Sequence, residues 1–350
     1  MIKNIPLKSV KKGLIIATLI LASIAITGTI FIYKQLNSSI NWTSNKTFII
    51  KSGAGVEKII KQLSEDKVIT APEEILRIYA LVTRFRGTLK AGEYDLSETR
   101  TPIEILALFR SGKVLVRRIT FIEGWTFAEW RNHLKKSPFI THILGDTEDE
   151  KLMFGIAGKP DLAPEGWFFP DTYQFTRGDS DIQILRRAHR KMTNILEEEW
   201  SIRTVGNSIT NIYDALILAS IIESETGVDE DRGKISQVFV RRLNRNIRLQ
   251  SDPTVIYGLG RTFDGNLTKN DLRKKTPFNT YTNFGLPRTP IGMPSLASIK
   301  AALNPEKTEY LYFVGKGDGA SYFSKTLAEH NRAVELYQRS GRLKNYQSAP

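Results

Sequence analysis

The chain has 350 residues, 41% of them hydrophobic and 25% charged, a composition typical of folded proteins and a length above that of one ordinary domain. It contains no cysteine, and its four histidines include no H-x-x-x-H pair, which excludes disulfide frameworks and cysteine nucleophiles and gives no reason to expect a metal or cofactor. The net charge of +13 suits an anionic surface or polymer without naming one.

A membrane anchor with a short cytoplasmic tail is predicted over residues 1–36. Residues 13–33 carry no charge over 21 positions, close to the roughly 20 residues that span a hydrocarbon core. Four lysines precede this stretch and two follow it: Lys3, Lys8, Lys11 and Lys12, then Lys34 and Lys46. We therefore expect a single-pass protein of the cytoplasmic (inner) membrane, with its N-terminus inside and its body on the external or periplasmic side. A cleaved signal peptide is the alternative, disfavoured by the length of the apolar stretch.

A small α/β unit is predicted over residues 47–113, after a polar linker at 37–46. The unit is expected to hold two short strands and three helices: strands at 48–50 and 93–96, a helix over the apolar stripe 56–63, one opened by the capping-box pattern Thr70-Ala71-Pro72-Glu73, and one that runs from Thr101-Pro102 to Gly112. None of these segments carries a cluster of chemical groups. By itself the unit therefore indicates a spacer or a binding module.

The remaining residues, 114–345, are predicted to form one larger domain, and the whole chain is assigned to the α+β class. The expected elements of this larger domain are a strand at 114–121, helices at 125–134 and 181–200, and a hairpin of 310–314 and 321–323. The stretch PEGWFFPD at 164–171 gathers three aromatic residues between two prolines. It could form a sugar-stacking wall or a buried corner, and composition does not decide between them.

The segment 212–227 carries the main chemical signal. Residues 215–222 are apolar on almost every side, which predicts a core helix too short to span a bilayer. Glu223 follows four residues after Ala219, so its carboxyl group extends a buried face. Burial raises a carboxyl pKa, and a C′ cap at Gly227 would place Glu223 near the negative end of the helix dipole, which acts in the same direction. An acid that is neutral near pH 7 is what protonation of a glycosidic oxygen requires.

Two alternatives remain open for this glutamate. It could be a structural residue paired with a nearby arginine, such as Arg232, Arg241 or Arg242. Glu225 also competes with it on the same reasoning, because it follows the apolar residues of the helix at helical spacing. Other chemistries are disfavoured, since the chain has no complete phosphate loop, no G-x-S-x-G and no H-E-x-x-H, and we expect no nucleic-acid partner.

Short segments along nearly the whole chain form an ordered series: KAGEY at 90–94, EGWFFPDT at 165–172, LASIIESET at 218–226, RL at 242–243, LQSDPTVIYG at 249–258, FNTY at 278–281, GLP at 285–287, YLYFV at 310–314 and HN at 330–331. In this order they resemble the endolytic murein transglycosylases of the YceG-like family. The chain departs from the family pattern at Phe278, where tyrosine is common, and at 288–291, which lacks the usual proline–glycine continuation.

The resemblance implies a membrane-anchored lytic transglycosylase, a lyase that cleaves MurNAc–GlcNAc bonds within nascent peptidoglycan strands and so terminates their elongation. It places the catalytic acid/base at Glu223 and implies that residues 47–113 are a LysM-like, glycan-binding subdomain and 114–345 the catalytic domain. The implied partners are peptidoglycan glycan strands, the cytoplasmic membrane and peptidoglycan synthases (penicillin-binding proteins).

One glutamate suffices for this reaction. The C6 hydroxyl of the muramic acid attacks C1 within the same sugar, so no second carboxylate has to activate water, and an anhydro-muramoyl end forms. Four residues are predicted to line the cleft and hold sugar groups: Gln250, Asp252, Asn279 and Tyr281. Turn or capping roles are the alternative for each of them. We expect Glu225 to orient Glu223 or to brace the helix end. His330 is expected either behind the site or on the surface, on a helix opened by the pattern Thr326-Leu327-Ala328-Glu329.

Two other functions stay open at this stage. One is a hydrolytic muramidase in which Glu165, Glu225 or Asp252 supplies a second carboxylate. The other is a non-catalytic, membrane-tethered scaffold that binds peptidoglycan. The products formed from glycan strands distinguish all three.

Overall fold

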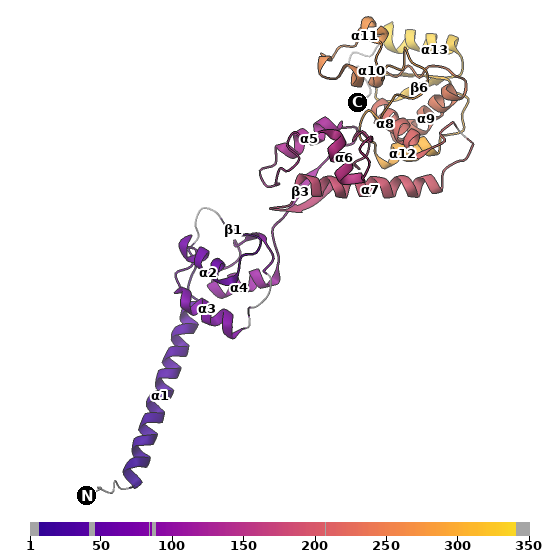
Figure 1. Cartoon of the computed structure of the whole chain (residues 1–350). Coiled ribbons are helices and arrows are strands. Elements are labelled where there is room, and N and C mark those ends of the chain that lie inside the picture. Colours follow the sequence, from indigo (N-terminus) through magenta and orange to yellow (C-terminus); the bar gives the residue numbers. More distant parts are fainter. Residues whose placement is uncertain (1–6, 42–45, 84, 86–88, 207, 341–350) are drawn as a thin grey trace. The chain divides into compact units, whose positions relative to one another are not determined.

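The computed structural model describes residues 7–41, 46–83, 85, 89–206 and 208–340 (Figure 1). The chain forms two compact units, one of residues 1–117 with 176–178 and one of residues 118–175 with 179–350. The sequence-based predictions for residues 1–6, 42–45, 84, 86–88, 207 and 341–345 lie outside the described residues. The predicted domain boundary at 113/114 stays a prediction.

The first unit begins with α1 (Leu7–Leu36). Its segment Lys11–Leu36 is long and apolar enough to cross a membrane, with a mean hydropathy of 2.4, and it is the one such segment among the described residues. The helix does not end in a free linker, because Leu36 and Ile40 are buried in the hydrophobic core of the first unit and Ile32 packs against that core. A helix of this composition is compatible with an anchor or with a signal sequence.

The rest of the first unit is a two-stranded antiparallel sheet with three helices. The strands β1 (Thr47–Ile50) and β2 (Gly92–Asp95) pair with Phe48 opposite Tyr94, and the helices are α2 (Val56–Glu65), α3 (Glu73–Val82) and α4 (Pro102–Ser111). The rings of Phe48 and Tyr94 both pack on Phe109, with centroids 5.3 and 4.9 Å away.

The helix ends of this unit test two predicted caps. The Thr101 side chain accepts a hydrogen bond from the backbone N–H of Glu104, and Gly112 closes the same helix in the left-handed region at φ 65°, so both ends of α4 are confirmed. The capping box predicted at Thr70 is wrong. Helix α3 begins after Pro72, and no side chain caps it.

The second unit is mostly helical, and with its two small sheets it confirms the α+β class. Its elements are β3 (Val116–Thr120), which leads in from the first unit, α5 (Phe127–Lys135), α6 (Asp149–Ala157), β4 (Thr172–Thr176), α7 (Asp181–Ser201), α8 (Ile212–Glu225), α9 (Asp229–Asn244), α10 (Asp252–Leu259), a 3-10 turn (Gly260–Thr262), α11 (Lys269–Arg273), α12 (Leu296–Leu303), β5 (Tyr312–Gly315), β6 (Ser321–Ser324), α13 (Leu327–Val334) and a π turn (Glu335–Arg339). Strand β3 pairs with β4, and β5 forms the predicted antiparallel hairpin with β6.

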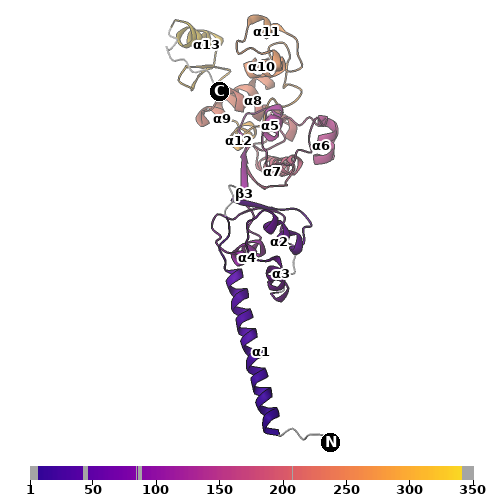
Figure 2. The same ribbon diagram turned by 90° about the vertical axis from the view of Figure 1, so that its left-hand side faces the viewer.

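Helix α8 is the centre of this unit. Every residue from Ala215 to Glu223 is buried, and the helix packs against α7, α9, α10 and α12, beside which it lies in both ribbon views (Figures 1 and 2). Asn211 caps its N-terminus by accepting a hydrogen bond from the backbone N–H of Asp214. The predicted left-handed cap at Gly227 is wrong, because the helix ends at Glu225 and continues into extended backbone at Thr226. The buried part of α8 thus positions its last residues, Ser224 and Glu225, which are partly exposed.

The aromatic stretch 164–171 is a buried corner. Phe168 and Phe169 are 0% and 9% exposed, and Trp167 stacks on Tyr213 with centroids 6.0 Å apart. These rings therefore belong to the core and are not available as an exposed sugar-stacking wall.

Candidate active site

A pocket of about 580 Å³ opens where the last turn of α8 meets the start of α10. Side chains from α8, α9, α10, the hairpin β5–β6 and α13 line it, and its polar members are Ser224, Glu225, Arg242, Gln250, Asp252, Tyr281, Ser321, His330 and Gln338. The fold thus brings Gln250, Asp252 and Tyr281, three of the four residues expected in the cleft, together with Glu225, and their contact with sugar groups stays a prediction. Glu223 and Asn279 are not among the lining residues.

Glu225 is the acid of this pocket. Its side chain is half-buried, and Oε1 accepts a 2.5 Å hydrogen bond from the Ser251 hydroxyl. Burial raises the pKa of Glu225 to about 7 and the negative charge of Asp252 acts in the same direction, while the Ser251 hydrogen bond and the charge of Arg242 oppose the rise. Near neutral pH a large fraction of these carboxyl groups therefore carries a proton.

Asp252 and Tyr281 form a hydrogen-bonded pair in the same pocket. The Tyr281 hydroxyl donates to Asp252 Oδ1 over 2.5 Å. Burial raises the pKa of Tyr281, and the neighbouring Asp252 carboxylate adds to the effect, so the phenol stays a donor. Asp252 is the first residue of α10, where the positive end of the helix dipole favours a carboxylate.

Arg242 fixes the segment that carries Gln250. Its guanidinium donates to the carbonyl oxygens of Leu249 and Leu311 over 2.8 Å each, and to Gln250 Oε1 over 3.3 Å. Gln250 itself has a φ of 54°, a left-handed conformation that non-glycine residues rarely adopt. A non-glycine residue is held there only by its surroundings, and such positions cluster at functional sites.

His330 belongs to this pocket too. Its ring stacks on Tyr312 with centroids 5.2 Å apart, and burial lowers its pKa, with the charge of Arg242 adding to the effect. A neutral imidazole beside the sugar-sized cavity can serve as a hydrogen-bonding wall. The predicted opening of its helix is confirmed, because Thr326 and Glu329 form a reciprocal capping box.

Glu223 is not among the residues that line this pocket, and its carboxyl group contacts a set of donors. It is 8% exposed, and its Oε2 accepts hydrogen bonds from the Ser295 hydroxyl and, over 2.9 Å, from the Ser295 backbone N–H. Its Oε1 lies 3.6 Å from Nη2 of Arg232, and Gly124 lies close to its side chain. The predicted pairing with Arg232 is therefore present, and these contacts suit a residue that ties the end of α8 to the start of α12.

Asn279 has a structural position as well. Its side chain is fully buried, and its amide nitrogen donates to the carbonyl oxygens of Leu272 and Lys274 over 3.1 and 2.7 Å. Its carbonyl oxygen accepts from the backbone N–H of Tyr281 over 2.8 Å. The predicted substrate contact finds no support in this geometry, because Asn279 shapes the turn that presents Tyr281.

Local sequence patterns give no role to Ser251 and offer Arg242 only as a structural partner for Glu223. Both lie in segments of the ordered series, RL at 242–243 and LQSDPTVIYG at 249–258. A signal therefore existed, but no local spacing connects either residue to the end of α8. Only the fold shows that Ser251 contacts Glu225.

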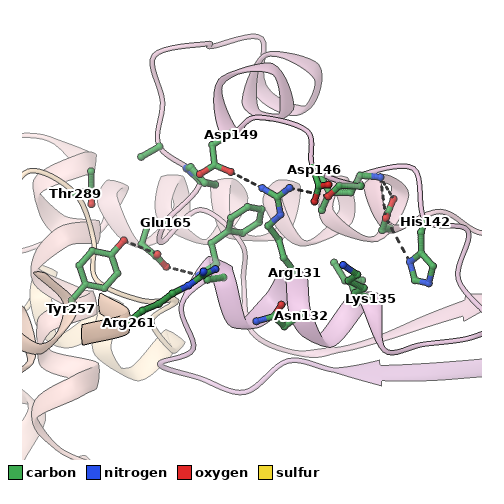
Figure 3. A pocket seen from close by; sticks show the side chains of 18 of the residues that line it. Arg131, Asn132, Lys135, His142, Asp146, Asp149, Glu165, Tyr257, Arg261 and Thr289 are labelled. Atoms are coloured by element: carbon green, nitrogen blue, oxygen red, sulfur yellow. Dashed lines mark hydrogen bonds and ion pairs between the residues drawn. The ribbon is translucent and has the colours of Figure 1, made fainter. Parts of the chain in front are cut away.

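A second pocket, of about 840 Å³, lies around Glu165 (Figure 3). Glu165 is 6% exposed and accepts hydrogen bonds from the Tyr257 hydroxyl over 2.8 Å and from the Phe127 backbone N–H over 2.9 Å. Burial raises its pKa to about 7, against both hydrogen bonds. This acid lines another cavity than Glu225, which disfavours it as a second carboxylate for the same bond.

Comparison with known proteins covers both units. A model of the YceG-like family matches residues 48–336. The endolytic murein transglycosylase of Bacillus subtilis (strain 168) is 32% identical over 338 residues, which are 89% of this chain and 91% of that protein. The endolytic murein transglycosylase of Streptococcus pneumoniae serotype 2 is 26% identical over 92% of this chain, which spans 65% of the pneumococcal protein. A crystal structure of a YceG-like protein from Listeria monocytogenes matches with a TM-score of 0.54 and 31% identity, over 82% of this chain and 97% of that one.

Proposed function

The chain belongs to the YceG-like family, and from this premise we propose that it is a lytic transglycosylase that cleaves peptidoglycan glycan strands internally, with Glu225 as its acid/base. The relatives named endolytic murein transglycosylases support the reaction class. The observation that carries the assignment is the place of Glu225 in the wall of the pocket that also holds Gln250, Asp252 and Tyr281, and burial of this carboxyl group raises its pKa to about 7.

The proposal exchanges the roles predicted for the two glutamates at the end of α8. Glu225 lines the pocket and holds a proton near neutral pH, whereas Glu223 is turned toward Ser295 and Arg232. A general acid must reach the leaving oxygen directly, so a place in the wall of the pocket favours Glu225 over Glu223 for this role.

The chemistry follows from one carboxyl group. Protonated Glu225 donates its proton to the glycosidic oxygen as the C1–O bond breaks, and the C6 hydroxyl of the same muramic acid attacks C1. The resulting Glu225 carboxylate takes the proton of that hydroxyl, which leaves an anhydro-muramoyl end. The carboxylate of Asp252, held by the Tyr281 hydroxyl, stabilises the positive charge that develops on the sugar ring.

A hydrolytic muramidase remains the second candidate, because one observation favours it. Glu225 and Asp252 line the same pocket, and two carboxyl groups at one bond are the pattern of glycosidases that use water. Mass spectrometry of digested glycan strands distinguishes the two, since hydrolysis gives a reducing end that incorporates solvent oxygen and transglycosylation gives an anhydro end without it.

The acid/base assignment is tested by a matched pair of variants, Glu225→Gln and Glu223→Gln, each of which keeps the side-chain shape. We expect Glu225→Gln to lose about 10²- to 10⁴-fold in cleavage rate, the usual contribution of a general acid/base. Glu223→Gln should keep more activity at equal folded content. Full activity of Glu225→Gln would overturn the assignment, and absence of cleavage by the wild type would favour the peptidoglycan-binding scaffold.

The proposal includes the setting of the reaction. Helix α1 anchors the chain in the cytoplasmic membrane, the 47–113 subdomain binds glycan in the manner of LysM, and cleavage near peptidoglycan synthases terminates strand elongation. The length and hydropathy of α1 support the anchor. Intact mass spectrometry of the protein from membranes tests it, because a cleaved signal sequence would remove the mass of α1.

A further inference from the structure

Helix α3 in the first unit has an exposed apolar face at its C-terminal half. Ile78, Leu81 and Val82 are 50%, 61% and 75% exposed. They follow one another at i, i+3 and i+4, so they share one side of the helix. Outside α1, the described residues of this unit expose five large apolar side chains, and three of the five form this face.

Helix α3 lies where α1 enters the unit. Helix α3 packs against α1, and both ribbon views show it at the end of α1 that joins the unit (Figures 1 and 2). The opposite, N-terminal end of α3 carries Glu73 and Glu74. The apolar and the acidic halves of one short helix are thus separated along its axis.

The length of α1 sets the depth of this region in a bilayer. Its exposed apolar side chains run from Leu14 to Tyr33, a span of about 30 Å in an α-helix, which matches the thickness of a hydrocarbon core. Leu36, less than one turn after Tyr33, is already buried in the unit. The unit therefore begins at the depth where acyl chains give way to headgroups.

We propose that Ile78, Leu81 and Val82 of α3 insert into the interfacial layer of the membrane that α1 spans. The inference rests on the proposed anchor and adds a second membrane contact, made by the globular unit itself. Phospholipid is the occupant that the geometry favours, because α3 packs against α1 and both helices expose large apolar side chains. Amphipathic helices bind this layer through apolar area of this kind.

Site-directed labelling of the full chain tests the proposal, and the absence of native cysteine makes single labels simple. Leu81→Cys, Val82→Cys, Ile24→Cys and Lys58→Cys each receive an environment-sensitive fluorophore. The proteins are reconstituted in vesicles of phosphatidylethanolamine and phosphatidylglycerol that contain a nitroxide lipid. The nitroxide is near the headgroup for labels at 58, 81 and 82, and deep in the acyl chain for the label at 24. Ile24 reports on α1, and exposed Lys58 on α2 is the control within the same unit.

We expect the headgroup nitroxide to quench most of the fluorescence of the labels at 81 and 82, while the label at 58 stays unquenched. A quenched label at 24 with unquenched labels at 81 and 82 would overturn the interfacial contact and leave the anchor standing. An unquenched label at 24 would overturn the anchor and the contact together. Equal quenching at 58 and 81 would also refute the proposal, since the contact would not be specific to α3.

Discussion

The Glu225→Gln variant allows the effect of this carboxyl group on folding stability to be measured separately from its effect on the cleavage reaction. The amide keeps the shape of the side chain and can still accept the hydrogen bond of Ser251, but it cannot ionise. We expect the variant to lose glycan cleavage and, above neutral pH, to be more stable than the wild type.

The magnitude follows from the pKa of Glu225, which burial raises from 4.5 to about 7. A rise of that size corresponds to about 3 kcal/mol, and screening from the pocket side of the half-buried group reduces this to about 2 kcal/mol. The folded protein binds the proton more tightly than the unfolded chain does. Proton binding at Glu225 therefore stabilises the folded state fully below pH 4.5, and this stabilisation is lost as the pH rises through about 7.

Thermal unfolding of both proteins at about pH 5 and about pH 8 measures the effect. Relative to the wild type, Glu225→Gln should gain about 2 kcal/mol between the two pH values, or about 4–8 °C in Tm for a unit of this size. Glu197→Gln, at an exposed position on α7, controls for the removal of one negative charge. If the stability difference between Glu225→Gln and the wild type is the same at both pH values, the raised pKa of Glu225 is refuted.

Three further predictions concern the surroundings of the site. Asp252→Asn removes a charge that raises the pKa of Glu225, so the upper limb of the pH profile of kcat/KM should move to lower pH; a limb that does not move would contradict this electrostatic link. Asn279→Ala should lower the free energy of unfolding, measured with urea, by about 3 kcal/mol, because the lost hydrogen bonds are buried, and KM should change little. A raised KM at unchanged stability would instead favour a substrate contact. Gly292→Ala should cost about 1–3 kcal/mol, because its Cβ would stand 2.5 Å from the carbonyl oxygen of Gly124, and unchanged stability in calorimetry would show that the segment moves freely.

The helices and their ends show how far local sequence carries a prediction. Thr101 and Thr326 cap their helices as expected, since a cap needs only residues within one turn. Thr70 has the same local pattern, yet α3 begins after Pro72 without a side-chain cap. The apolar run 215–222 predicted the buried helix α8 for a simple reason, because a helix that is apolar on all sides has to lie in a core.

The choice between Glu223 and Glu225 could not be made from the same run. Residues two apart on a helix differ by about 200° in direction, so the two carboxyl groups face different neighbours although the apolar stripe supports both. The hydrogen-bond partners that distinguish the two carboxyl groups are distant in the sequence: Ser295 for Glu223 and Ser251 for Glu225. Gln250, Asp252 and Tyr281 were predicted from the ordered series of segments, and the fold gathers them in one pocket.

The burial of Leu36 and Ile40 in the first unit leaves no flexible joint directly after α1. A helix that is longer or shorter than the local bilayer compensates by tilting, and hydrophobic mismatch then changes its angle to the membrane normal. A rigid junction passes that angle on to the unit that carries α3 and the small sheet. With α1 in a membrane as proposed, the thickness of the surrounding lipid would thus set the orientation of this unit relative to the bilayer.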